Sequence, residues 1–246
     1  MCGIVGYTGP QSAVTPLIEG LRRLEYRGYD SAGIALGTSN KLFVEKKAGK
    51  LSNLEGALTG VPTVHSGIGH TRWATHGGPT DRNAHPHLDN EGKLAVIHNG
   101  IIENYSELKA ELQSRGHQFH SETDTESVAH LLSDLRKEFN GDLTAAMREA
   151  VKRLRGSFTL LAVHADKPDL IVGVRRNSPL VVGLGNGENF MASDVAAFIE
   201  YTKRAVELGQ DEVVTITPDS ISITDLSGNA LKPKEYQITW DAAAAQ

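Results

Sequence analysis

The order of the expected secondary structure limits most strongly how this chain can fold: strands predominate at its two ends, and most helices group between them. The strand candidates in the first hundred residues are 4–8, 32–37, 41–47, 66–71 and 94–98. From Ser157 onward, strand-like stretches alternate with turn signals such as HADKPD and GNGEN. These stretches read FTLLAVHA, DLIVGVR, PLVVGL, NFMAS, DEVVTIT and SISITDL.

Helices are expected at 12–24, 104–115, 125–139 and 143–154. In the first, apolar residues recur at three- and four-residue steps from Val14 to Leu24, and Pro16 lies in the first turn, where its missing N–H is harmless. Thr123 or Asp124 is expected to cap the third helix. Strands at both ends with helices between them predict an α+β layered domain with mainly antiparallel sheets.

The chain is expected to form one domain over 1–240, because no internal linker divides it. The tail DAAAAQ, residues 241–246, is expected to begin a linker. An apolar content of 39% and a charged content of 22% are ordinary for a globular protein. The net charge of -5, without a basic tract, argues against nucleic acid or an anionic membrane as a partner.

Cysteine usage and the N-terminal residues bear on the compartment. One cysteine cannot form an internal disulfide, so the fold is not built for an oxidising compartment. No signal peptide and no membrane-spanning apolar run is apparent, and a cytoplasmic location is expected.

The single cysteine, Cys2, has two interpretations. It is either a small buried apolar residue at the start of a strand, as free cysteines often are, or a nucleophile. Removal of the initiator methionine would place a free α-amine on the residue that carries the thiol. Because that amine titrates near neutral pH, it could serve as the base that the thiol needs.

Three segments carry more polar chemistry than packing requires, and each also has a plain structural reading. GHTRWATHGGPT, residues 69–80, would by itself be an exposed loop with a salt-bridging arginine. Asn99-Gly100, after the apolar strand in LAVIHNGIIENY, is either a turn dipeptide or a pair of donors forming an oxyanion hole. Asp124, in SETDTES, is either a helix cap or the partner of a ligand ammonium group.

Six ordered segments together resemble a known family. They are CGIVGY at the N-terminus, LEYRGYDSAGI, GHTRWATHG, NAHPH, HNGIIENY and SETDTE. This set resembles the glutaminase domain of the glucosamine-6-phosphate synthase family, a branch of the class II glutamine amidotransferases, over nearly the whole chain. The resemblance implies the N-terminal nucleophile hydrolase fold, a four-layer sandwich with two mainly antiparallel sheets between helical layers.

The resemblance also implies the chemistry of the site. Cys2 would attack the side-chain amide carbon of L-glutamine with its own α-amine as base, and Asn99 and Gly100 would hold the oxyanion. Ammonia would leave, and water would hydrolyse the thioester to glutamate. Neither a cofactor nor a metal ion is implied.

For substrate binding, the resemblance implies that Arg72 takes the glutamine α-carboxylate, with Thr75 and His76 as further donors, and that Asp124 takes the α-ammonium. Trp73 resembles a gating tryptophan on the loop that closes over the glutamine.

Three further residues have supporting roles in the resemblance. Arg27 and Gly28 lie in the motif that supports the nucleophile, and His85 in NAHPH belongs to the same supporting set.

A complete synthase of this family continues into a sugar-isomerase part, which this sequence is expected to lack. The chain would therefore hydrolyse glutamine without making the amino sugar, and the full enzyme could form a homodimer. Several alternatives stay open. They are the glutaminase of another class II amidotransferase, a hydrolase of a different amide, a catalytically silent binding module, and a metal hydrolase using some of the eight histidines between 65 and 120.

Overall fold

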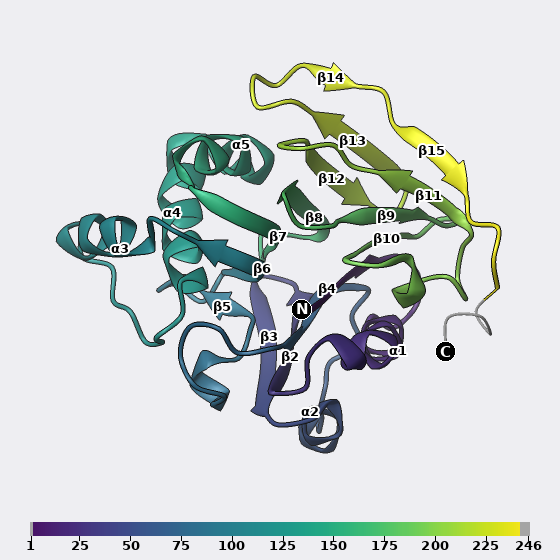
Figure 1. The fold of residues 1–246 in the computed structure, drawn as a ribbon, viewed down its shortest axis with the longest axis horizontal. Helices are drawn as coiled ribbons and strands as arrows, with labels where there is room; N and C mark the ends of the chain where they lie inside the picture. The colour runs from purple at the N-terminus through teal and green to yellow at the C-terminus, as the bar shows by residue number, and fades with distance from the viewer. Residues whose placement is uncertain (1, 242–246) are drawn as a thin grey trace.

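Two antiparallel sheets form the centre of the molecule (Figure 1). The structure is a computed structural model, and it describes residues 2–241. The eight-stranded sheet has the order β15 (Lys234–Gln237), β11 (Arg204–Glu207), β9 (Val181–Leu184), β10 (Asn189–Ala192), β1 (Gly3–Thr8), β4 (Ser66–Arg72), β2 (Ser31–Thr38) and β3 (Lys41–Ala48). The seven-stranded sheet has the order β14 (Ala230–Leu231), β13 (Ser220–Thr224), β12 (Val213–Thr217), β8 (Lys167–Arg176), β7 (Gly156–His164), β6 (Leu94–Ile102) and β5 (His87–Leu88).

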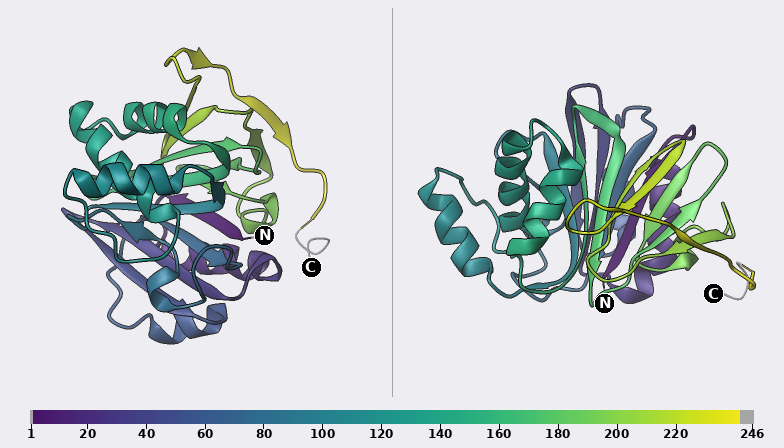
Figure 2. Two further views of the ribbon diagram at one scale, coloured as in Figure 1. Left: turned by 60° about the vertical axis from the view of Figure 1, so that its left-hand side comes forward. Right: turned by 90° about the horizontal axis from the view of Figure 1, so that it is seen from above.

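Helices cover the outer face of each sheet, so the molecule has four layers (Figure 2). The eight-stranded sheet is covered by α1 (Val14–Leu24) and α2 (Leu51–Ala57). On the seven-stranded sheet lie α4 (Thr125–Glu138) and α5 (Leu143–Arg153), and α3 (Tyr105–Ser114) packs against α4. The expected α+β fold with two antiparallel sheets between helical layers is confirmed.

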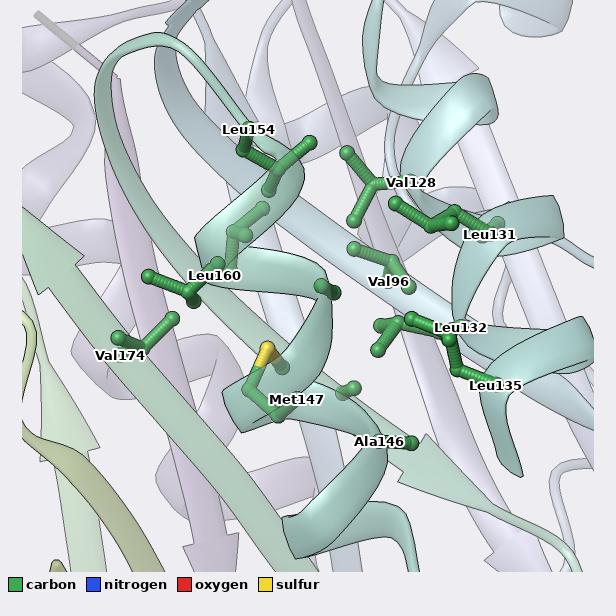
Figure 3. Close-up of a cluster of buried hydrophobic side chains, with 14 of the residues drawn as sticks. Val96, Val128, Leu131, Leu132, Leu135, Ala146, Met147, Leu154, Leu160 and Val174 are labelled. Carbon is green, nitrogen blue, oxygen red and sulfur yellow. The ribbon is translucent and has the colours of Figure 1, made fainter. Parts of the chain in front are cut away.

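Three apolar cores hold these layers together. One lies between α1, α2 and the eight-stranded sheet, and another lies between the two sheets. The third lies between α3, α4, α5 and the seven-stranded sheet, where Leu132, Met147 and Leu160 are fully buried (Figure 3). Burying one such side chain contributes about 1.5–3 kcal/mol. The two sheets are thus held face to face, which fixes residues of β1 and β4 against residues of β6.

The structure differs from the sequence-based elements chiefly at β6. This strand does not end at His98 but continues to Ile102, and Asn99 and Gly100 pair with Thr159 and Phe158 of β7. The turn-dipeptide interpretation of Asn99-Gly100 is therefore wrong, and so is their placement at a strand end. Residues 98–100 do not continue the apolar run of 94–97, so no local pattern indicates that the pairing with β7 extends this far.

Other differences are short elements. Local sequence patterns did not predict α2, β5, β11, β14 and β15, or the short 3-10 helices Glu25–Arg27, Asp81–Asn83 and Val195–Ala197. Residues 242–246 of the expected linker lie outside the described residues. Within residues 2–241, no helix is both long enough and apolar enough to span a membrane.

Candidate active site

Cys2 lies where three strands of the eight-stranded sheet bring distant residues together. It directly precedes β1, and β1 pairs with β4 so that Gly3 lies opposite Thr71. Arg72 therefore ends β4 beside Cys2, and the chain leaves the sheet there as the loop that begins with Trp73. Because β1 lies inside its sheet, between β10 and β4, the strand that follows Cys2 is held from both sides.

A cavity of about 330 Å³ opens beside Cys2, between the two sheets and the start of α4. This volume is at the lower end of the range typical of small-molecule sites. The predicted site residues that line it are Cys2, Arg27, Arg72, Trp73, Thr75, His85, Asn99, Gly100 and Asp124. Residues without a predicted role complete the wall: His98, Ile101, Thr125, Ser157, Asn177, Ser178 and Pro179. Gly28 and His76 are outside this lining.

The thiol of Cys2 is partly buried and contacts the first residue of the loop. The backbone N–H of Trp73 donates a hydrogen bond to Cys2 Sγ at 3.1 Å. Burial raises the pKa of the Cys2 thiol, although the Trp73 N–H and the positive charge of Arg72 act in the opposite direction. A buried thiol of this kind stays protonated at neutral pH and needs a base to become a nucleophile.

Gly28 supports this arrangement by its lack of a side chain. A Cβ on Gly28 would lie 2.7 Å from the carbonyl carbon of Arg72 and 2.8 Å from the nitrogen of Trp73. Only glycine lets the backbone come this close to the peptide that donates to Cys2. Arg27, next to it, forms an ion pair with Asp194 at 2.8 Å.

Asn99 reaches Cys2 from the other sheet. Its Nδ2 donates to the carbonyl oxygen of Cys2 at 2.9 Å, and its Oδ1 lies 3.0 Å from Nε2 of His70. The next residue, Gly100, has a φ of 115°, and a Cβ there would lie 2.1 Å from the carbonyl oxygen of Ser157. Gly100 thus adopts a left-handed conformation that side chains disfavour, and its missing side chain leaves the backbone accessible from the cavity.

Asp124 is buried at the first turn of α4, but its side chain does not cap the helix. Instead, its Oδ2 accepts a hydrogen bond from the backbone N–H of Ile102 at 2.8 Å, and its Oδ1 lies 3.9 Å from Nδ1 of His98. The capping expectation for Asp124 is therefore wrong as regards its side chain, and Thr123 does not cap either, because its hydroxyl contacts His87 at 2.9 Å. A carboxylate remains on the cavity wall.

Arg72 is buried, and its guanidinium fixes the loop that follows it. The group donates to the carbonyl oxygens of Gly78 and Gly77 at 3.1 Å each, and also to that of His76. Burial lowers the pKa of Arg72, but the nearby Cys2 and Asp124 oppose this shift, and a guanidinium keeps its charge in proteins. A positive and a negative side chain thus share one cavity.

Two ring side chains of the loop after β4 pack against tyrosines from other segments. Trp73 is 48% exposed and packs edge-on against Tyr29, with ring centroids 5.8 Å apart. The ring of His76 packs against Tyr105 at 5.3 Å instead of facing the cavity. Asp30 secures this loop on both sides of Trp73, because it donates its N–H to the Arg72 carbonyl and accepts from the Ala74 N–H, each at 2.9 Å.

The histidines around the cavity form a packed, neutral group. His85 stacks on His70 with ring centroids 4.1 Å apart, and its Nδ1 accepts the backbone N–H of His98 at 3.2 Å. Burial lowers the pKa of His85, His87 and His98, and that of His70 falls to about 3. Among residues 2–241, no three His, Cys, Asp or Glu side chains are placed to hold a metal ion, so this geometry lends no support to the metal-hydrolase alternative.

Sequence reasoning overlooked His70, Asp30 and the 177–179 segment of the wall. His70 and Asp30 do lie within the quoted motifs GHTRWATHG and LEYRGYDSAGI, which was the available signal. Their contacts depend on how β4 faces β6 and how the loop folds back, and neither is readable from spacing. For the 177–179 segment, we find no sequence signal.

Comparison with known proteins places this arrangement in a family. The sequence model described as a glutamine amidotransferase domain matches residues 70–200. Among curated proteins, the chain is 59% identical over 250 residues to the glutamine–fructose-6-phosphate aminotransferase (isomerizing) of Streptomyces coelicolor, and 53% identical over 247 residues to that of Thermus thermophilus. Each match covers 100% of this chain but only 40% of the relative. The chain therefore spans well under half the length of these relatives.

Similar solved structures are also glutamine amidotransferases or enzymes of purine biosynthesis. Glutamine phosphoribosylpyrophosphate amidotransferase from B. subtilis, complexed with ADP and GMP, has a TM-score of 0.76 at 25% identity, over 93% of this chain and 50% of that one. A structure described as the allosteric regulatory enzyme of purine biosynthesis has a TM-score of 0.79 at 27% identity, with the same coverage. The fold is thus the N-terminal nucleophile type of these amidotransferases. With its family match and its relatives, the chain belongs to the glutamine amidotransferase domain family of enzymes.

Proposed function

We propose that this chain hydrolyses the side-chain amide of L-glutamine to glutamate and ammonia, with Cys2 as the nucleophile. The observation that carries the proposal is the meeting of Cys2 with Asn99 across the sheets, in a cavity that also holds Arg72 and Asp124. A thiol, an amide donor and two opposite charges in one cavity of this size match an amino acid with a carbonyl on its side chain.

The first step forms a tetrahedral intermediate with a new bond between sulfur and carbon. Cys2 Sγ attacks the glutamine amide carbon, and the thiol proton passes to the α-amine that Cys2 carries once Met1 is removed. The carbonyl oxygen becomes an oxyanion, which accepts hydrogen bonds from Asn99 Nδ2 and the Gly100 N–H. One Nδ2 hydrogen is engaged with the Cys2 carbonyl, and the second is available to the oxyanion. Such a donor typically contributes about 10²–10³-fold to kcat.

The second step releases the products. The amide nitrogen takes the proton from the Cys2 ammonium and leaves as ammonia, and the C–S bond remains as the thioester. Water then attacks the thioester carbon and gives a proton to the α-amine, and the same donors hold the second oxyanion. When the C–S bond breaks, the ammonium returns that proton to sulfur, and glutamate leaves with the thiol restored. The side chains, the α-amine and the backbone N–H groups of this chain are enough for these steps, and no cofactor is invoked.

The charges at the far end of the cavity select the substrate. Asp124 pairs with the glutamine α-ammonium, and Arg72 with Thr75 holds the α-carboxylate. The carbonyls of the 76–78 loop already orient the Arg72 guanidinium, so less of its freedom is lost on binding. His76 would reach the carboxylate only if its loop moved, and Trp73 on that loop would cover the bound glutamine.

Gly28, Arg27 and His85 support the site without binding the substrate. Gly28 gives the Trp73 N–H its place against Cys2, Arg27 forms part of the wall, and His85 packs between the sheets beside His70. None of the three needs to contact the reacting atoms.

For the longer proteins that carry this domain, we propose that its ammonia serves the amination of fructose 6-phosphate. The identity of 53–59% to the curated aminotransferases supports this acceptor more strongly than the 25–27% identity to the solved amidotransferases supports a phosphoribosyl acceptor. The sugar-isomerase part, the sugar phosphate and a homodimer of the full enzyme are then its partners, in the synthesis of hexosamines.

Two measurements test the proposal. The purified chain should convert glutamine into equal amounts of glutamate and ammonia. Intact-mass spectrometry should show the loss of Met1, followed by the addition of one glutamine-mimicking electrophile at Cys2. Glutamine left unconsumed by a protein whose N-terminus is Cys2 would contradict the proposal.

A further inference from the structure

The His70 side chain contacts both the Asn99 side chain and the backbone carbonyl of His98. It belongs to β4, it is fully buried, and it faces β6 of the other sheet. Its Nε2 lies 2.9 Å from the carbonyl oxygen of His98 and 3.0 Å from Oδ1 of Asn99. His70 does not line the cavity, so it cannot contact a ligand there.

We propose that His70 is a positioning residue that fixes the Asn99 side-chain amide with its NH₂ group toward Cys2 and the oxyanion. This inference rests on the proposed glutaminase function and adds a residue to it. Without His70, only the Cys2 carbonyl oxygen would hold the Asn99 amide against a turn of 180°, which would present the amide oxygen to the oxyanion and repel it. A fixed partner for the oxygen excludes that state.

The protonation of His70 follows from its partners. A backbone carbonyl can only accept, so the His98 contact requires a proton on Nε2 of His70. Burial lowers the pKa of His70 to about 3, and the ring therefore carries a single proton at any pH at which the enzyme is assayed. Its Nδ1 has no hydrogen-bond partner among the described residues, which agrees with the proton being on Nε2.

This tautomer decides the orientation of Asn99. The single Nε2 hydrogen is shared between the His98 carbonyl and the Asn99 atom 3.0 Å away, so that atom must also accept and is therefore the oxygen. The opposite end, Nδ2, then meets the Cys2 carbonyl oxygen, which also can only accept, at 2.9 Å. The backbone carbonyl oxygens of His98 and Cys2, which can only accept, thus fix the direction of the hydrogen bonds that run from His70 through Asn99 to Cys2.

The ring of His70 is itself held in place. His85 stacks on it at 4.1 Å with an interplanar angle of 10°, and Nδ1 of His85 accepts the His98 N–H at 3.2 Å. His70 consequently has little freedom to release Asn99, and the donor for the oxyanion is oriented before glutamine binds.

Three substitutions separate positioning from packing. His70→Phe keeps a ring against His85 but removes the donor, His70→Gln can place an N–H where Nε2 lies, and His70→Asn has the same amide on a side chain too short to reach. We expect kcat for glutamine hydrolysis to fall by about 10–10²-fold in His70→Phe and His70→Asn, with KM unchanged. His70→Gln should keep most of the wild-type kcat. The glutamine and asparagine variants carry the test if the phenylalanine variant fails to fold.

Alkylation of Cys2 distinguishes a positioning role of His70 from a purely structural one. Iodoacetamide reacts at a saturated carbon and needs no oxyanion hole, and Cys2 is the single cysteine in the sequence. The alkylation rate of Cys2 should therefore be the same in wild type and all three variants, whereas glutamine turnover differs. Equal losses of alkylation and turnover would show a disordered site and contradict the inference.

A double-mutant cycle completes the test. If His70 acts through Asn99, His70→Asn should cause no further loss of kcat in an Asn99→Ala background. Independent, multiplying losses would overturn the inference, as would full kcat in His70→Asn. A wild-type chain that releases no glutamate would contradict the proposed function and this inference together, whereas an active wild type with active His70→Asn contradicts the inference alone.

Discussion

The side-chain amide of Asn99 donates a hydrogen bond to the carbonyl oxygen of Cys2, and this 2.9 Å contact joins the two sheets at the cavity. Cys2 directly precedes β1, whereas Asn99 lies inside β6. The proposed nucleophile and the proposed oxyanion donor are therefore held by two separate sheets, and the packing between those sheets sets their distance. Catalytic geometry in this domain depends on its innermost core.

Replacing the nucleophile tests the central assignment. Cys2→Ala should abolish glutamate release, because no other group takes the place of the thiol, and it should leave glutamine binding largely intact, because Arg72 and Asp124 remain. Calorimetric titration with glutamine and an assay for glutamate provide the two readouts. Retained turnover in Cys2→Ala would eliminate the nucleophile assignment.

The carboxylate of Asp124 is predicted to act on binding rather than on chemistry. In Asp124→Asn, an oxygen can still accept the Ile102 N–H, so the local structure survives while the negative charge is lost. A hydrogen bond to a charged group contributes about 1.5–3 kcal/mol, and we expect KM for glutamine to rise by about 10–100-fold with kcat little changed.

The neighbouring Glu122 offers the control for that experiment. It is exposed, and it accepts a hydrogen bond from Asn83 at 2.9 Å that a glutamine could also accept. Glu122→Gln should therefore leave KM unchanged. A KM in Asp124→Asn equal to that of wild type would count against the ammonium contact.

The sequence alone predicts more of the fold than of the site. Apolar periodicity located α1, α3, α4 and α5 and most of the long strands, because each buries one face or two. It failed at Gly100, where the strand continues through a residue without a side chain, and at the two-residue strands β5 and β14. Short pairings are made by tertiary neighbours, which no local pattern records.

Most of the candidate site came from a resemblance of motifs, and the structure adds what motifs cannot express. The residues Cys2, Arg72, Asn99 and Asp124 are far apart in the chain, yet all line one cavity. The roles of His70 toward Asn99 and of Asp30 toward the Trp73 loop depend on the facing of two sheets and on a loop closing on a strand. Neither contact can be inferred from the spacing of residues along the sequence.

Gly100 should tolerate no side chain. An alanine there would have to adopt a φ near 115° and would bring its Cβ to 2.1 Å from the Ser157 carbonyl, so β6 and β7 would have to separate. We expect Gly100→Ala to lower the free energy of unfolding by more than about 2 kcal/mol and to remove turnover, as measured by urea unfolding and glutamate release.

Gly116 is the matched control, because its φ of 94° is also positive but nothing lies within 4 Å of a Cβ there. Gly116→Ala should cost only the conformational term of about 1–2 kcal/mol and keep turnover. Equal losses of stability in the two variants would show that the clash with Ser157 is not what restricts position 100.

Glu126 is predicted to make the stability of the fold depend on pH. Burial by itself would raise its pKa, but hydrogen bonds from His130, from the Ser121 hydroxyl and from the backbone N–H groups of His120 and Ser121 bring the pKa down to about 2. The ordinary value in an unfolded chain is about 4.3. Because the folded pKa is the lower one, the contribution of Glu126 is fully present above the unfolded value and is lost as the pH falls from about 4.5 toward 2.

The substitution Glu126→Gln should therefore destabilise the protein most at neutral pH. A shift of this size corresponds to at most about 3 kcal/mol, and we expect a loss of about 1–3 kcal/mol at pH 7 that shrinks as the pH approaches 2. Urea unfolding at several pH values measures it. Glu138→Gln, exposed near the end of the same helix, is the control and should change stability little at any pH. If the loss in Glu126→Gln were the same at pH 7 and at pH 2.5, the carboxylate charge would not be its source.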